Sequence, residues 1–328
     1  MRILFAGSPG IAVPSLEVLA SMDGKGFTFA GLLTNADSPK GRSGKPEPTE
    51  CAEAVMRLSA GRLSENPITI LKPQKLDSDI RSKIAALEPD LLVSFAYGKI
   101  FGPKFLALFP MGGINIHPSL LPKYRGPTPI PAAIINRDTE TGITIQRLAE
   151  QMDSGDILVQ EKIDLNGKET TASLNKIMGE KAAQMLPVIL EGIAGGTLQT
   201  KEQDHASATY CSLISKEEGL IDWSLSALEI DARIRAFNPW PLSWTTHGEL
   251  ELYILKAEPI NSHSPSLNMI PDFKHPGRVL GKDNNMGILI QTGNGVLAVS
   301  ELQYRSKKAL GWKDFLNGAR NFIGTQLG

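Results

Sequence analysis

The chain has 328 residues, a formal net charge of −1 and an apolar content of 41%. This length exceeds one average domain, so we expect two domains, and the composition is typical of a soluble globular protein. The near-zero charge excludes a broadly basic protein, so any nucleic-acid contact must come from a local patch. The sequence has no run of about 18 apolar residues, so we expect no membrane span.

The cysteine content and the N-terminus bear on the compartment. Cys51 and Cys211 are far apart and lack metal-binding spacing. We therefore expect neither a disulfide framework nor a metal site, and a reducing cytoplasm is the natural compartment. Residues 1–7 carry too short an apolar run for a secretory signal.

The first half of the chain alternates predicted strands and helices, which indicates a Rossmann-like α/β domain with a mostly parallel sheet. A buried strand over 3–6 ends at a G-S-P-G turn, and a helix follows from Pro14. Because this turn is not G-x-G-x-x-G, we expect no dinucleotide site. The later predicted strands are 27–33, 90–97, 114–117, 143–148 and 157–163, and the later helices are 49–59, 78–87, 129–136 and 171–193.

The strand predicted over 114–117 carries the strongest functional signal. Its side chains alternate between apolar and polar, so Asn115 and His117 project to the same face. Pro118 cannot extend a central ladder, so the strand ends there. An amide and an imidazole are thus expected at the carboxyl end of a strand, where open α/β sheets place their ligand crevices.

These residue types suit acyl transfer without a covalent intermediate. A neutral imidazole can move a proton between two nitrogens, and an amide N–H can bind a developing oxyanion. A nearby carboxylate would orient the ring, and the M-D-S-G-D run offers Asp153 and Asp156. Spacing alone does not choose between them. The alternative is that Asn115 and His117 are buried polar groups satisfied by the backbone.

The second half has a different pattern. Residues 195–208 have the composition of a linker, and Ser226 to Glu229 read as a capping box before a helix. Short strands at 250–256, 277–280, 287–292 and 296–302, with tight turns, predict a small OB-like β-barrel. The expected domains are therefore 1–200 and 207–328.

Two separate blocks of sequence resemble one family. The run INIHPSLLPKYRGPTP at 114–129 and MDSGD at 152–156 resemble the formyltetrahydrofolate-dependent transferases. A second block, which comprises 213–218, 221–224 and 234–241, resembles the members of that family that act on methionyl-tRNA.

The resemblance implies an activity and a set of roles. The expected donor is 10-formyltetrahydrofolate, and the expected acceptor and partner is initiator methionyl-tRNA, without a metal. Asn115 would stabilise the oxyanion, His117 would shuttle the proton, and Asp153 would orient His117. The family likeness thereby selects Asp153 over Asp156. We expect a monomer.

The resemblance also implies two binding surfaces. Residues expected to line the folate pocket are Gly98, Lys99, Ile100, Ser119, Leu120, Leu121 and Pro122. Residues expected to contact tRNA are Arg42 and Lys45, in a long polar loop over 34–49, and the basic residues Arg305, Lys307 and Lys308. Departures from the family pattern occur at Gly10, 46–47 and 127–128.

Two alternatives stay open. The same trio of site residues, which here would be Asn115, His117 and Asp153, occurs in formyltransferases that act on sugar nucleotides or glycinamide ribonucleotide, and in deformylating hydrolases. A member of another class would be a non-catalytic tRNA-binding module, against which the intact trio argues. The basic residues also have an alternative interpretation without function: those of the 34–49 loop would belong to a solvated loop, and Arg305, Lys307 and Lys308 to a solvated edge.

Overall fold

The computed structural model describes residues 1–39, 44–61, 68–260 and 275–328. These residues form two compact units. The first unit comprises Met1–Pro129, Glu140–Asp164 and Ser173–Ser212, and the second comprises Ile130–Thr139, Leu165–Ala172 and Leu213–Gly328. Arg42 lies outside the described residues.

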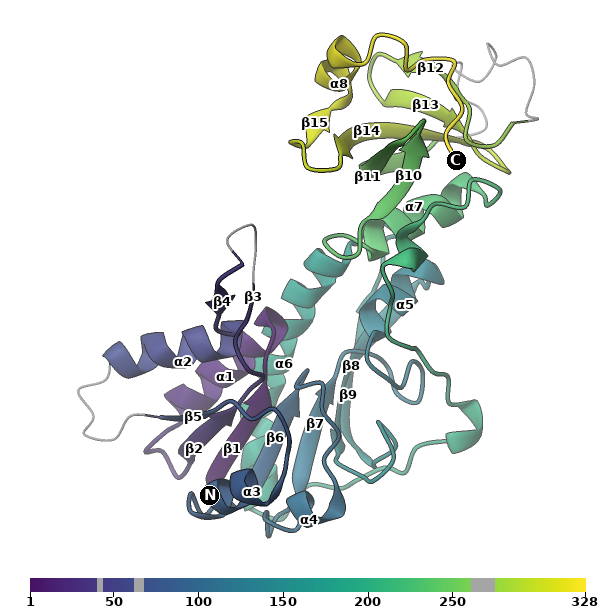
Figure 1. Ribbon diagram of the computed structural model, residues 1–328. Helices are drawn as coiled ribbons and strands as arrows, with labels where there is room; N and C mark the ends of the chain where they lie inside the picture. The colour runs from purple at the N-terminus through teal and green to yellow at the C-terminus, as the bar shows by residue number, and fades with distance from the viewer. Residues whose placement is uncertain (40–43, 62–67, 261–274) are drawn as a thin grey trace. The chain divides into compact units, whose positions relative to one another are not determined.

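The first unit is built on a seven-stranded sheet with the order β5-β2-β1-β6-β7-β8-β9 (Figure 1). Its strands are β1 (Arg2–Gly7), β2 (Thr28–Leu33), β5 (Thr69–Leu71), β6 (Leu91–Phe95), β7 (Gly113–His117), β8 (Glu140–Arg147) and β9 (Ile157–Asp164). The first five are parallel to one another, β8 is antiparallel to β7, and β9 is antiparallel to β8. The predicted Rossmann-like, mostly parallel sheet is confirmed; the three-residue β5 was not predicted.

The sheet is buried because its side chains alternate between two faces and helices pack on it. The helices of this unit are α1 (Val13–Ser21), α2 (Glu50–Gly61), α3 (Ser78–Ala85), α4 (Pro103–Leu106) and most of α6 (Thr171–Ala194), with a 3₁₀ turn at Gly10–Ala12. Helix α5 (Pro129–Ile135) belongs to the second unit except for Pro129. Leu4 and Ala6 of β1 pack with Ile80 and Ile84 of α3 and Phe105 of α4. Because successive strand residues point to opposite faces, Ile3 and Phe5 are buried on the far face of the sheet.

The base of the long polar loop is pinned at the carboxyl edge of the sheet. The Thr34 hydroxyl lies 3.2 Å from the Ser8 hydroxyl and 2.7 Å from that of Thr49. Thr49 in turn accepts the backbone N–H of Ala52 and so caps α2. Two short antiparallel strands, β3 (Ser38–Pro39) and β4 (Pro46–Glu47), pair within the loop.

The second unit is an antiparallel β domain with the strand order β10-β11-β14-β13-β12, and β15 pairs with β14. The strands are β10 (Ser243–His247), β11 (Leu250–Pro259), β12 (Val279–Asp283), β13 (Gly287–Gln291), β14 (Val296–Tyr304) and β15 (Leu310–Gly311). Helices α7 (Ala227–Ala236) and α8 (Trp312–Gly318) pack their apolar residues on this sheet. The predicted capping box is present, because Ser226 and Glu229 bond each other's backbone N–H. The expected β domain is confirmed.

No helix within the described ranges is long and apolar enough to cross a bilayer.

Candidate active site

Asn115 and His117 lie on β7, between the parallel strand β6 and the antiparallel strand β8. Asn115 is opposite Ser94 on one side and Gln146 on the other, and His117 is opposite Thr144. The strand ends at His117, as the following proline predicts. This arrangement confirms that the amide and the imidazole sit near the carboxyl end of a strand in the interior of the sheet.

Asp153 reaches these side chains from the loop between β8 and β9. Its own backbone is in the left-handed region, with φ +54°, a conformation that is uncommon for residues other than glycine. Gly155 follows, and a Cβ at that position would lie 1.9 Å from the carbonyl oxygen of Arg147. Only glycine therefore allows this loop to fold back so closely on the end of β8.

Three N–H groups from separate segments converge on the Asp153 carboxylate. Oδ1 accepts from Asn115 Nδ2 at 3.2 Å and from Gln146 Nε2 at 3.0 Å. Oδ2 accepts from the backbone N–H of Gly126 at 2.8 Å and lies 3.5 Å from His117 Nδ1. The structure thus brings together Asn115, His117 and Asp153, which are spread over 38 positions of the sequence.

His117 is held in one orientation and one tautomer. Its Nε2 lies 2.8 Å from the carbonyl oxygen of Tyr124. A carbonyl only accepts, so Nε2 carries the hydrogen, and Nδ1 of the neutral ring faces Asp153 with its lone pair. The ring is only 4% exposed, and this burial lowers the pKa of His117 below its ordinary value of 6.5, against the opposing effects of the Asp153 charge and the Tyr124 carbonyl. The imidazole is therefore neutral near pH 7.

Gly126 also requires its special backbone. It has φ +117°, and a Cβ there would lie 2.2 Å from the carbonyl oxygen of Cys211. The segment around Cys211 therefore packs directly against the loop that aims the Gly126 N–H at Asp153. Burial also raises the pKa of the Cys211 thiol.

The predicted Ser119–Pro122 folate loop is tied internally by several of its polar groups. The Ser119 hydroxyl is buried and donates to the carbonyl of Lys123 at 2.6 Å. Thr144 donates to the Ser119 carbonyl and accepts from the Leu121 N–H, and Gln160 donates to the Leu121 carbonyl. These bonds fix the path of the loop. They leave Leu120 and Pro122, both half-buried, as its partly accessible side chains.

The other predicted folate-pocket segment follows β6. Gly98 has φ +81° with open space around its Cα, and Ile100 is 71% exposed. Lys99 is half-buried and its Nζ donates to the carbonyls of Pro73 and Gln74. Burial lowers the pKa of Lys99. This turn therefore presents backbone and one apolar side chain to solvent.

The predicted tRNA-contacting residues differ in their surroundings. Arg305 is paired with Glu251 at 2.7 Å, so part of its charge is used within the second unit. Lys307 and Lys308 are exposed on the turn after β14, and Lys45 is exposed beside β4.

Three further side chains belong to the site, and we did not predict them from the sequence. Gln146 donates to Asp153, Gln203 donates to Gln146 Oε1 at 3.1 Å, and Arg125 donates to Gln203 Oε1 at 2.7 Å. The alternation of side chains along β8 could have indicated Gln146, because Gln146 lies opposite Asn115 on the neighbouring strand. Gln203 lies in the segment read as a linker, so nothing local marked it.

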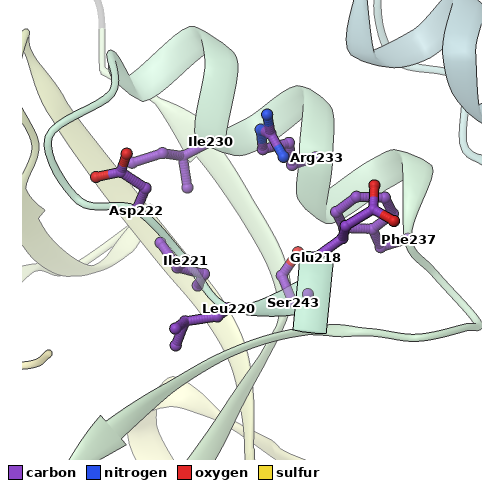
Figure 2. A pocket seen from close by; sticks show the side chains of 9 residues that line it. Glu218, Leu220, Ile221, Asp222, Ile230, Arg233, Phe237 and Ser243 are labelled. Carbon is purple, nitrogen blue, oxygen red and sulfur yellow. The ribbon is translucent and has the colours of Figure 1, made fainter. Parts of the chain in front are cut away.

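A small pocket in the second unit is a weaker candidate. Figure 2 shows that its lining includes Ile221, Ile230 and Phe237 beside Arg233 and Ser243. Its volume of about 10 Å³ is room for about one water molecule, and its lining includes none of Asn115, His117 and Asp153. Among the described residues, no three His, Cys, Asp or Glu side chains gather as metal ligands would.

Comparisons with known proteins point to one family. Residues 1–190 match the family described as formyl transferase, and residues 213–320 match its C-terminal domain. A methionyl-tRNA formyltransferase of Treponema denticola is 50% identical over 98% of both chains. One from Treponema pallidum is 43% identical over 100% of this chain and 99% of that protein.

Solved structures share the fold at lower identity. HypX from Aquifex aeolicus in complex with tetrahydrofolic acid has a TM-score of 0.62 at 16% identity, and the match covers 98% of this chain and 48% of HypX. An N-formyltransferase from Helicobacter canadensis has a TM-score of 0.63 at 19% identity, over 91% of this chain and 99% of that one. The two family matches and the full-length relatives show that the chain belongs to the formyl transferase family, among the methionyl-tRNA formyltransferases.

Proposed function

We propose that this protein transfers the formyl group of 10-formyltetrahydrofolate to the α-amine of initiator methionyl-tRNA, in the cytoplasm. The observation that carries the proposal is the convergence of Asn115, His117 and Asp153 in a chain that aligns end to end with curated methionyl-tRNA formyltransferases. The amine nitrogen attacks the formyl carbon, the bond from that carbon to the folate nitrogen breaks, and one proton moves between the two nitrogens.

His117 moves that proton. Its Nε2 is committed to the Tyr124 carbonyl, so Nδ1 is the basic nitrogen. The ring is neutral because it is buried, and a neutral ring can accept a proton from the attacking amine. Once protonated, Nδ1 faces the Asp153 oxygen 3.5 Å away, which stabilises the imidazolium until the leaving nitrogen takes the proton back.

Asn115 and Asp153 prepare the site for this step. Each amide nitrogen of asparagine carries two hydrogens. Asn115 gives one to Asp153 Oδ1, which fixes the amide and directs its second N–H as a donor for the oxyanion of the tetrahedral intermediate. Asp153 thus orients the amide, the Tyr124 carbonyl orients the neutral imidazole, and the Asp153 charge acts on the ring once Nδ1 is protonated.

The folate would bind beside the turn after β6 and the Ser119–Pro122 loop. The exposed Ile100 side chain and the open backbone at Gly98 suit a flat, partly apolar heterocycle. The loop is already rigid through its bonds to Thr144 and Gln160, so little entropy is lost when a ligand binds.

A sugar-nucleotide formyltransferase is the second candidate, because enzymes of that kind share the fold. Their identity to this chain is 19%, against 50% for the tRNA-specific relative from Treponema denticola. The higher identity extends through the C-terminal domain and favours the tRNA acceptor.

The first prediction concerns the catalytic side chains. We expect His117→Ala and Asn115→Ala each to lower kcat by about 10²-fold or more, the usual size of acid–base and oxyanion effects. The measurement is formylation of charged initiator methionyl-tRNA with 10-formyltetrahydrofolate, together with filter binding of the tRNA. The matched control is His275→Ala, because His275 is an exposed histidine of the second unit.

Formylation should be lost while tRNA binding is kept. Near-wild-type rates in either site variant would contradict the assigned roles. A wild-type protein that binds tRNA but does not formylate it would instead support the non-catalytic module, and formylation of an amino-sugar nucleotide in its place would support the second candidate.

The second prediction concerns the protonation of His117. Because burial lowers its pKa, the native ring should titrate below pH 6.5, whereas the unfolded chain takes up the same proton near 6.5. The native state is therefore destabilised as pH falls below 6.5, and this contribution is absent above it. An NMR titration of the ring carbon-bound protons measures this directly and avoids the ionisation of the substrate amine. A midpoint at or above 6.5 would show that the Asp153 charge outweighs burial.

The third prediction concerns the tRNA. Replacing Lys307 and Lys308 with alanine should raise KM for methionyl-tRNA and reduce the slope of log affinity against log salt by about one for each lost phosphate contact. Arg42→Ala should likewise impair the use of tRNA more than the use of folate, on the sequence resemblance alone. KM for 10-formyltetrahydrofolate is the internal control. An effect confined to folate would reverse these assignments.

A further inference from the structure

We propose that Arg125, Gln203 and Gln146 form a positioning relay that decides which end of an amide faces Asp153. The relay begins at a donor-only guanidinium, passes through two buried amides and ends at the catalytic carboxylate. The inference deepens the proposed formyl transfer and rests on it. None of the three residues touches the reacting atoms, so each is a positioning residue.

The first link is set by the chemistry of arginine. Arg125 is 3% exposed, and its Nε and one terminal nitrogen lie 3.2 Å and 2.7 Å from Gln203 Oε1. A guanidinium has five N–H groups and no acceptor. Gln203 must therefore turn its oxygen towards Arg125. Arg125 also donates to the Tyr210 hydroxyl at 3.4 Å and to His205 Nδ1 at 2.9 Å.

The second link follows from the first. With its oxygen fixed, Gln203 turns its Nε2 towards the carbonyl oxygens of Gly155 at 2.6 Å and Asp153 at 2.9 Å, and towards Gln146 Oε1 at 3.1 Å. Gln203 itself is 4% exposed, so water cannot replace these partners readily. The amide thus clamps the backbone of the loop that carries Asp153.

The third link reaches the catalytic group. Because Gln146 uses its oxygen to accept from Gln203, its Nε2 is left to donate to Asp153 Oδ1 at 3.0 Å. A reversed Gln146 amide would place oxygen lone pairs against the carboxylate in a buried site. That contact is repulsive, and it would drive the carboxylate away from His117. Because Arg125 can only donate, it fixes the orientation of the Gln203 and Gln146 amides and, through them, the position of the Asp153 carboxylate.

The backbone holds the two ends of the relay together. The Arg125 N–H donates to the Thr209 carbonyl at 2.8 Å, and the Cys211 N–H donates to the Arg125 carbonyl at 2.9 Å. The segment from Gln203 to Cys211, of which residues 203–208 were read from sequence as part of a linker, is thus a fixed wall of the active site. If Gln203 served only to fill space, its shape would matter and its N–H groups would not. A variant of the same shape that lacks those N–H groups therefore distinguishes packing from the relay.

The test is Gln203→Glu, which keeps the shape and the acceptor for Arg125 but removes the N–H donor. We expect kcat for formyl transfer to methionyl-tRNA to fall by about tenfold or more, as happens at metal sites when the hydrogen-bond partner of a ligand is removed. KM for both substrates should stay within a few-fold. The matched control is Gln199→Glu, the same change at an exposed position of the same segment, which should leave kcat unchanged.

A second pair of variants keeps the proposal falsifiable if Gln203→Glu folds poorly. Arg125→Lys preserves a donor-only cation and should retain most of kcat, whereas Arg125→Gln can present either end of its amide and should lose it. Thermal unfolding of all variants separates a loss of stability from a loss of rate. Equal rates for Gln203→Glu and wild type, or for Arg125→Lys and Arg125→Gln, would overturn the relay.

Neutron diffraction on the wild-type protein supplies a readout that does not depend on activity. One deuterium atom on Gln146 should point at Asp153 Oδ1, and of the two on Gln203 one should point at Gln146 Oε1 and the other at the carbonyl of Gly155. An amide oxygen of Gln146 facing Asp153 would overturn the relay even if the enzyme is active. If wild-type protein does not formylate methionyl-tRNA, the proposed function fails, and the amide orientations still decide the relay.

Discussion

The site depends on one carboxylate that receives hydrogen bonds from three directions. Asp153 accepts from a strand side chain, a loop backbone N–H and a second strand side chain, and it lies 3.5 Å from the imidazole. Each donor belongs to a different segment, so the carboxylate can occupy this position only when the sheet, the loop after β7 and the loop after β8 are all formed. The chemistry is therefore a property of the whole first unit.

The loops meet these demands through unusual backbone. Gly126 and Gly155 bring main chain so close to neighbouring carbonyls that a methyl group would overlap them, and Asp153 itself has a positive φ. Glycine adopts such backbone freely, but the left-handed conformation of Asp153 costs free energy, and folded structures retain it where surrounding contacts over-determine it. Here the contacts are the bonds to Asp153 and the clamp made by Gln203. Strain and catalytic geometry are thus located in the same loops.

Local periodicity predicted the strands that build the sheet and the shared face of Asn115 and His117, because alternation along one strand is a short-range signal. Spacing could not choose Asp153 over Asp156; the family likeness did, and in the structure Asp156 instead accepts from Thr200 at 3.1 Å. Arg125 and Gln203 are 78 positions apart. Their contact arises from tertiary folding, and no local pattern in either segment predicts it. The short strand β5 was missed for a related reason, since three residues are too few for a pattern.

The central claim is that the Asp153 carboxylate beside His117 stabilises the imidazolium and so allows the ring to move the proton between the two nitrogens. The most direct measurement is single-turnover formyl transfer by Asp153→Asn, which keeps the size of the side chain and removes the charge. The account predicts a loss of about 10²-fold or more in the rate of the chemical step, with the binding of folate and tRNA largely kept. A variant that transfers the formyl group at the wild-type rate would contradict it.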